Sequence, residues 1–171
     1  MKIAIVGAHQ VGKTTLAEEL MNHLPGYTMV REPYYALEDS GYEFSDQPSV
    51  EDFVIQVEYS LRRISNDEDN VIFDRCSIDL LAYLHALDPG RDIQQLFEKI
   101  QESIRDIDLL VFVPIETPDL IPQHLVQFPK LRNEVDSLLH EWIPNLGIET
   151  MEVKGTLPKR SELVLARLAE D

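Results

Sequence analysis

Short apolar runs alternate along this chain with segments in which apolar residues recur at helical spacing. The runs are typical of buried strands, and the wider spacing is typical of helices that bury one face. Five strands are predicted, at residues 2–6, 28–31, 70–74, 108–113 and 149–153. Because strands and helices alternate, we expect an α/β fold with a five-stranded parallel sheet and helices on both faces.

Helical patterns fill most of the chain between these runs. Ser49 and Asp52 have the spacing of a capping box, which predicts a helix start, and Val57 and Leu61 belong to the apolar stripe that follows. The other predicted helices cover residues 15–24, 78–87, 93–105, 131–142 and 161–168. We expect residues 1–171 to form one domain, because this length suits a single core and the sequence contains no linker or repeat.

The first predicted strand leads into a phosphate-binding motif. Residues 7–14 match the complete pattern G-x-x-x-x-G-K-[ST], between a strand and a helix. In such a loop, backbone N–H groups surround the phosphates, the lysine contacts the β- and γ-phosphates, and the hydroxyl ligates Mg²⁺. We therefore expect Thr14 to bind Mg²⁺, and we expect ATP to be bound by Gly7, Ala8, His9, Gln10, Val11, Gly12, Lys13, Thr14 and Thr15.

Composition narrows the range of partners. The 31 acidic residues outnumber the 15 basic ones and give a net charge of -16, which disfavours nucleic acid and anionic membranes as partners. The single cysteine, Cys76, excludes a disulfide framework and a multi-cysteine metal site. We expect a cytoplasmic protein, because the sequence has no signal-peptide pattern and no apolar run of membrane-spanning length.

Two further segments offer candidate catalytic residues. Asp74 ends a predicted strand, where a carboxylate can lie beside Mg²⁺, although aspartate also ends strands as a turn former. Residues 116–129 contain three prolines and little periodicity, and they lead into Lys130 and Arg132. This lid-like region, around 116–132, either closes over the phosphates, so that Lys130 and Arg132 reach the transferred phosphoryl group, or is a solvated connector with two ordinary surface bases.

Several motifs in the same order resemble those of P-loop small-molecule kinases. Residues 74–83 look like the Asp-Arg-Ser-x-x-Asp-x-x-Ala-Tyr segment of nicotinamide mononucleotide kinase-type domains and, more distantly, of deoxynucleoside and thymidylate kinases. Residues 31–33, Arg-Glu-Pro, resemble the deoxynucleoside kinase segment in which a glutamate acts as the base, which implies that role for Glu32.

Two more segments extend the resemblance. Phe53 and Gln56 resemble the helix in which a glutamine contacts the acceptor's base, which implies an acceptor contact for Gln56; as an alternative, Gln56 is an ordinary residue of a helix face. Residues 155–160 resemble the loop that borders adenine, which implies a nucleotide contact for Arg160. The lid-like region departs from the pattern, because such kinases often carry several arginines there and this chain has Lys130 and Arg132 only.

The candidate residues suit phosphoryl transfer, which depends on positioning and on neutralising charge. Lys13, Mg²⁺ and Arg75 are expected to supply positive charge, although Arg75 has the alternative role of pairing with local carboxylates. Glu32 is the candidate that takes or orients the acceptor proton. Asp79 is a weaker candidate, and a first-turn acid favoured by the helix dipole explains it equally well.

The sequence therefore predicts an ATP- and Mg²⁺-dependent kinase with a small-molecule acceptor that resembles a nucleoside or nucleotide. A homodimer is compatible with these features. The alternative is a regulatory NTPase or ATP-binding switch module that acts on a protein partner, because the same loop would serve both.

Overall fold

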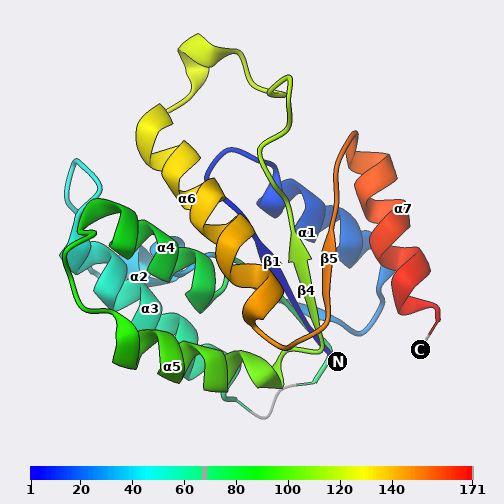
Figure 1. Ribbon diagram of the computed structural model, residues 1–171. Coiled ribbons are helices and arrows are strands. Elements are labelled where there is room, and N and C mark those ends of the chain that lie inside the picture. Colours follow the sequence, from blue (N-terminus) through cyan, green and yellow to red (C-terminus); the bar gives the residue numbers. More distant parts are fainter. Residues whose placement is uncertain (67–68, 171) are drawn as a thin grey trace.

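The computed structural model describes residues 1–66 and 69–170 and is built around a parallel sheet (Figure 1). The sheet has five strands in the order β2-β3-β1-β4-β5, and all four strand pairings are parallel. The strands are β1 (Lys2–Val6), β2 (Thr28–Val30), β3 (Val71–Asp74), β4 (Leu109–Phe112) and β5 (Thr150–Glu152). Each predicted strand is thus confirmed, with ends that differ by no more than one residue.

Helices cover both faces of the sheet, as the alternating pattern predicts (Figure 1). Helices α1 (Lys13–His23) and α7 (Leu157–Leu168) pack together on one face. Helices α3 (Val50–Ile64), α4 (Ser77–Leu87) and α6 (Pro129–Trp142) cover the other face, and α5 (Gln94–Ser103) packs beside α3 and α4. The central strands β1, β3 and β4 are almost completely buried, which is why they consist of continuous apolar runs.

The structure differs from the sequence-based expectations at several helices. Helix α2 (Pro33–Asp39) was not predicted, because its seven residues bury only Pro33 and Leu37 and so show no clear periodicity. The predicted helix 93–105 is α5 followed by a 3₁₀ turn, η1 (Ile104–Asp106). Helix α7 begins at Leu157 rather than at 161, so Arg160 lies in its first turn and not in a loop.

The parallel arrangement gathers the ends of several strands at one edge. Strand β1 runs into the phosphate-binding loop, and β3 pairs directly with β1, so that Asp74 at the end of β3 lies next to this loop. Strand β2 pairs with β3 and ends just before Glu32. Residues 116–132 follow β4 and are called the lid segment after the role predicted from the sequence. They contain the 3₁₀ turn η2 (Gln123–Leu125), and a further 3₁₀ turn, η3 (Ile143–Asn145), follows α6.

Among the described residues, no helix combines the length and apolar character needed to cross a membrane.

Candidate active site

The phosphate-binding loop requires glycine at both invariant positions of its motif. At Gly7 the backbone has φ 151°, and a Cβ atom would lie 2.3 Å from the carbonyl oxygen of Val113. At Gly12, the N-cap residue of α1, φ is 90° in the left-handed region. Because side chains other than hydrogen disfavour both conformations, the local geometry explains the two glycines without reference to a ligand.

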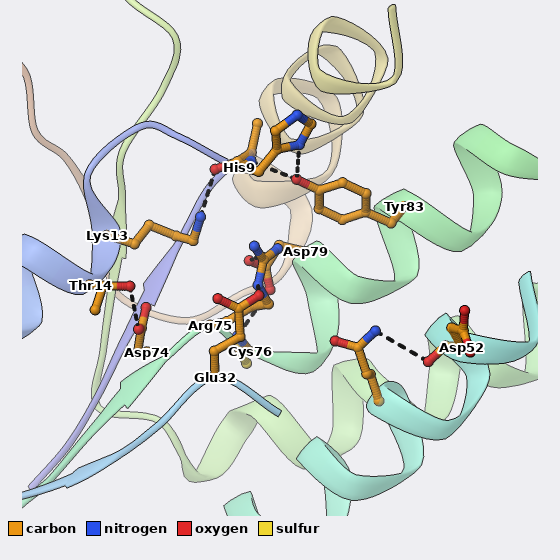
Figure 2. A network of polar contacts seen from close by, with 12 residues as sticks. His9, Lys13, Thr14, Glu32, Asp52, Asp74, Arg75, Cys76, Asp79 and Tyr83 are labelled. Carbon is orange, nitrogen blue, oxygen red and sulfur yellow. Dashed lines mark hydrogen bonds and ion pairs between the residues drawn. The ribbon is translucent and has the colours of Figure 1, made fainter. Parts of the chain in front are cut away.

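Lys13 is buried at the start of α1 and crosses the loop. Its ammonium group donates a hydrogen bond of 2.6 Å to the carbonyl oxygen of Ala8 (Figure 2). Burial, followed by the charge of Arg75, lowers the pKa of Lys13 to about 8, although nearby carboxylates oppose this effect. An anionic phosphate in the loop would favour the charged ammonium form.

Thr14 and Asp74 form an oxygen-rich pair beside the loop (Figure 2). The Thr14 hydroxyl donates to Asp74 Oδ2 at 2.6 Å. The other carboxylate oxygen, Asp74 Oδ1, is buried and has no hydrogen-bond partner among the described residues. Burial disfavours the charged form of Asp74 and so raises its pKa. A positive charge bound nearby would stabilise the ionised carboxylate. These hard oxygen donors fit Mg²⁺, which is held in such sites by few protein ligands together with phosphates and water.

Glu32 and Arg75 meet at the ends of β2 and β3. Arg75 Nε lies 2.8 Å from Glu32 Oε1, and Arg75 Nη1 lies 3.4 Å from Asp79 Oδ2 (Figure 2). Burial opposes the charge of Arg75, but the two carboxylates outweigh this effect and raise its pKa. Burial likewise opposes the charge of Glu32, and Arg75 and Lys13 lower its pKa. The structure therefore presents Glu32 as an ionised carboxylate held by a fixed guanidinium group.

Asp79 has a structural role at the start of α4. Its Oδ1 accepts the backbone N–H of Cys76 at 2.9 Å, which completes a capping box, while Oδ2 faces Arg75. The carboxyl group is fully buried, and burial raises its pKa to about 6 despite the charges of Arg75 and Lys13. These contacts support the helix-start interpretation of Asp79 and add a role in holding Arg75.

Two cavities border the phosphate-binding loop at different residues. The first, here called the Arg160 cavity, has a volume of about 400 Å³, and its lining includes Gly12, Thr15, Gly155, Thr156 and Arg160. The second, the Glu32 cavity, has a volume of about 180 Å³, and its lining includes His9, Glu32, Phe53, Gln56, Arg75 and Tyr83. The Arg160 cavity is lined mainly by residues predicted to bind nucleotide, and the Glu32 cavity contains the predicted acceptor-side residues Glu32 and Gln56. His9, which was expected to bind ATP, lines the Glu32 cavity instead.

Helices α3 and α4 supply a stacked aromatic pair to the lining of the Glu32 cavity. The rings of Phe53 and Tyr83 stack in parallel, with centroids 4.8 Å apart and an angle of 5° between their planes. Gln56 is buried, lines the cavity and donates to the carbonyl oxygen of Asp52 at 3.2 Å. A flat aromatic wall beside an amide suits a planar ligand with polar edges.

Arg160, in the first turn of α7, is hydrogen-bonded to the phosphate-binding loop. Its Nη1 donates to the carbonyl oxygen of Val11 at 2.7 Å, and its Nη2 pairs with Glu116 Oε1 at 2.7 Å. Glu116 also accepts the backbone N–H of Gly155 at 2.8 Å. Arg160 therefore lines the first cavity and also ties the loop to the beginning of the lid segment.

The lid segment lies against the loop. Gln10 donates to the carbonyl oxygen of Leu125 at 3.2 Å and accepts the backbone N–H of Gln127 at 2.8 Å. Arg132 is only 2% exposed; its Nε donates to the His9 carbonyl oxygen at 2.9 Å, and both of its terminal nitrogens contact the carboxylate of Asp119. Arg132 is thus not an ordinary surface base, whereas Lys130 is exposed.

Three residues of the site were not singled out from the sequence, namely Tyr83, Glu116 and Asp119. Tyr83 follows Asp79 by one helical turn, so it lies on the same face of α4, and this spacing is a signal that could have identified it. Glu116 and Asp119 pair with Arg160 and Arg132, which are distant in the sequence. No local pattern identifies such partners.

A parallel α/β sheet with a G-x-x-x-x-G-K-T loop between its central strand and first helix defines a P-loop nucleotide-binding protein. A family model described as an AAA domain matches residues 2–160, and the chain belongs to this family. No curated protein matches the chain by sequence.

Solved structures with the same fold include several kinases. Deoxyadenosine kinase from M. mycoides, with dCMP and dCDP bound, matches with a TM-score of 0.68 and 14% identity over 100% of both chains. Thymidylate kinase from Ehrlichia chaffeensis matches with a TM-score of 0.69 and 15% identity over 98% of both chains. NadR protein in complex with NR matches with a TM-score of 0.69 and 17% identity over 99% of this chain and 48% of that one. The resemblance to P-loop kinases is confirmed at the level of the fold.

Proposed function

We propose that this protein is an ATP- and Mg²⁺-dependent phosphotransferase with a nucleoside- or nucleotide-like acceptor. The observation that carries the proposal is the pair of cavities at one phosphate-binding loop, the second of which contains the Glu32–Arg75 ion pair. A protein that only binds or hydrolyses ATP needs one nucleotide cavity. A transferase needs a second cavity, in which an acceptor hydroxyl or phosphate meets the γ-phosphate.

The charge, position or contacts of each residue support its proposed role. Lys13 and Arg75 offset the negative charge of the transferred group. Thr14 and Asp74 hold Mg²⁺, which when bound neutralises charge on the phosphates. Glu32 accepts or orients the acceptor proton, because Arg75 keeps it ionised at the wall of the second cavity.

The remaining contacts position the two ligands. The Arg160 cavity receives the nucleoside part of ATP, and the Glu32 cavity receives the acceptor, with its planar part against Phe53 and beside Gln56. The lid segment excludes water during transfer. Arg132 acts by fixing this segment and the loop rather than as a free base, because His9 and Asp119 already bind its guanidinium group.

The similar structures support the class of acceptor. Of the three proteins with this fold compared above, one is a deoxyadenosine kinase described with dCMP and dCDP bound, and another is a thymidylate kinase. The third, NadR, is described in complex with NR. The planar wall of the Glu32 cavity agrees with an acceptor of this kind.

The test is acceptor-dependent release of ADP from MgATP across a panel of nucleosides, nucleoside monophosphates and small alcohols. We expect one class of nucleoside or nucleotide to raise the rate. Substitution Glu32→Gln should lower the acceptor-dependent rate by about 10² to 10⁴-fold, the usual contribution of acid–base catalysis, with little change in MgATP affinity. Glu18→Gln is the matched control, because Glu18 is an exposed acid of α1 outside the lining of both cavities.

Three outcomes would overturn parts of this proposal. If no small molecule raises ADP release and a protein partner does, the switch alternative replaces the kinase. If Glu32→Gln transfers phosphate at the parental rate, Glu32 is not the acceptor-side group. If Glu32→Gln loses MgATP affinity instead, Glu32 belongs to the metal site.

A further inference from the structure

His9, the third residue of the loop motif, connects the lid segment to the Glu32 cavity. Its ring Nδ1 lies 2.8 Å from the hydroxyl oxygen of Tyr83, and its ring Nε2 contacts the carbonyl oxygen of Gln127. The backbone N–H of His9 also donates to the Tyr83 hydroxyl at 2.6 Å. Figure 2 shows the imidazole directly above the Tyr83 hydroxyl, with Arg75 below the tyrosine ring.

The donors and acceptors along this path define a single tautomer of the neutral ring. A carbonyl oxygen can only accept, so Nε2 carries the hydrogen that meets Gln127. Nδ1 then has a lone pair, and the Tyr83 hydroxyl donates to it while accepting the backbone N–H of His9. Burial lowers the pKa of His9, and the charges of Arg75, Lys13 and Arg132 lower it further. The contact with Gln127 has the opposite effect but does not outweigh them.

Tyr83 is otherwise held from the side of the Glu32 cavity. Its ring stacks on Phe53, and the guanidinium carbon of Arg75 lies 5.1 Å from the ring centroid. The same tyrosine thus forms part of the cavity wall through its ring and contacts His9 through its hydroxyl group. One imidazole ring therefore links the Tyr83 hydroxyl group to the carbonyl oxygen of Gln127.

We propose that His9, as the neutral Nε2–H tautomer, is a positioning residue that couples docking of the lid segment to the order of Tyr83. The acceptor role of the Glu32 cavity rests on the proposed function, whereas the coupling is a property of the ligand-free protein. Because coupling between two sites is reciprocal, a ligand that orders Tyr83 stabilises the docked lid segment, and a docked lid segment strengthens binding of that ligand.

The tautomer is tested by nitrogen NMR of the ligand-free protein labelled with ¹⁵N-histidine at pH 7, with the His9 signals assigned by their loss in His9→Gln. We expect a protonated, pyrrole-type Nε2 and an unprotonated, pyridine-type Nδ1. A ring with hydrogen on Nδ1, or one protonated at both nitrogens, would overturn the proposal, since neither lets Tyr83 donate to His9. A residue that merely filled space would have no fixed tautomer.

The coupling is tested by hydrogen exchange of the ligand-free protein. The backbone N–H of Gln127 donates to the Gln10 side chain of the loop, so its exchange reports undocking of the lid segment. The backbone N–H groups of Leu125 and Val126 donate within the η2 turn, so their exchange reports the order of the lid segment itself. Tyr83→Phe keeps the ring and removes only the hydroxyl group. The hydroxyl group makes two hydrogen bonds to His9, and only the one to Nδ1 orders the imidazole ring. We therefore expect about fivefold faster exchange at these amides, the effect of losing one hydrogen bond of ordinary strength.

Two control variants separate this path from general loosening. Tyr42→Phe removes a hydroxyl group that donates to Asp52 at 2.9 Å and should leave exchange in the lid segment unchanged. Gln10→Ala should speed exchange in the lid segment and leave the His9 tautomer unchanged, because Gln10 contacts Leu125 and Gln127 directly. Parental exchange rates in Tyr83→Phe would refute the coupling. If the coupling holds but no acceptor supports transfer, only the proposed function fails.

Discussion

Replacing Asp74 by asparagine should increase the stability of the ligand-free protein and reduce the stabilisation by MgATP. The side chain is 2% exposed, and Oδ1 has no hydrogen-bond partner among the described residues. Its raised pKa means that folding disfavours the charged form, and this penalty is present at every pH above the folded-state pKa. Asparagine removes the charge at nearly constant shape, and its side-chain oxygen can still accept the Thr14 hydroxyl.

The size of the effect follows from these contacts. An unsatisfied buried polar group costs about 1 to 3 kcal/mol, and an asparagine N–H₂ group left in the same place keeps part of that cost. We therefore expect a gain of about 1 kcal/mol, which for a protein of this length raises Tm by about 2 to 4 °C. With MgATP the parent should be the more stable of the two proteins, because the variant binds MgATP less tightly. Each tenfold loss of MgATP affinity removes about 1.4 kcal/mol of stabilisation by the ligand.

The assay is thermal unfolding of parent and Asp74→Asn with no ligand, with ATP and EDTA, and with MgATP. The variant should have the higher Tm without ligand, a similar shift with ATP and EDTA, and a smaller shift with MgATP. A variant that is less stable than the parent and has the parental MgATP shift would show that Asp74 only ends β3. That result would also remove the basis for placing Mg²⁺ at this carboxylate.

Three further predictions concern Lys13, Arg132 and His9. Lys13→Ala should retain cooperative unfolding by circular dichroism but lose measurable ATP turnover, and turnover equal to the parent at saturating ATP would contradict the role of the loop. Arg132→Lys should lower the free energy of unfolding in urea by about 1 to 3 kcal/mol, because an ammonium group cannot replace the paired contacts with Asp119 and His9. The control Lys130→Ala, at an exposed residue, should leave this free energy unchanged. Folding lowers the pKa of His9, so protonation of this residue favours the unfolded chain. The parent should therefore lose stability relative to His9→Gln as pH falls below about 6.5. Parallel stability curves of the two proteins from pH 8 to pH 5.5 would argue against this.

The sequence predicted the elements whose signals are local. The strands are continuous apolar runs because a central parallel sheet is buried on both faces. The loop motif was complete in one short segment, and its glycines meet local backbone requirements at Gly7 and Gly12. The capping box at Ser49 is confirmed, since its side chain accepts the backbone N–H of Asp52. Helix α2 escaped prediction because it buries too little to show a period.

Tertiary structure alone decided how the candidate residues divide between the two cavities. Glu32, Gln56 and Arg75 come from separate elements, and only the order of the strands and the packing of α3 on α4 bring them to one wall.

Tertiary structure also decided the partners of the arginines and of His9. Arg132, considered from the sequence as a base that reaches the phosphates or as a surface residue, is buried against His9 and Asp119. No local pattern marks Asp119 as the partner of Arg132, and the helical spacing that places Tyr83 on the Asp79 face of α4 does not mark it as the partner of His9. A buried charge or imidazole needs a partner from whichever segment the fold brings within hydrogen-bonding distance, and that distance is set by packing between residues far apart in the chain.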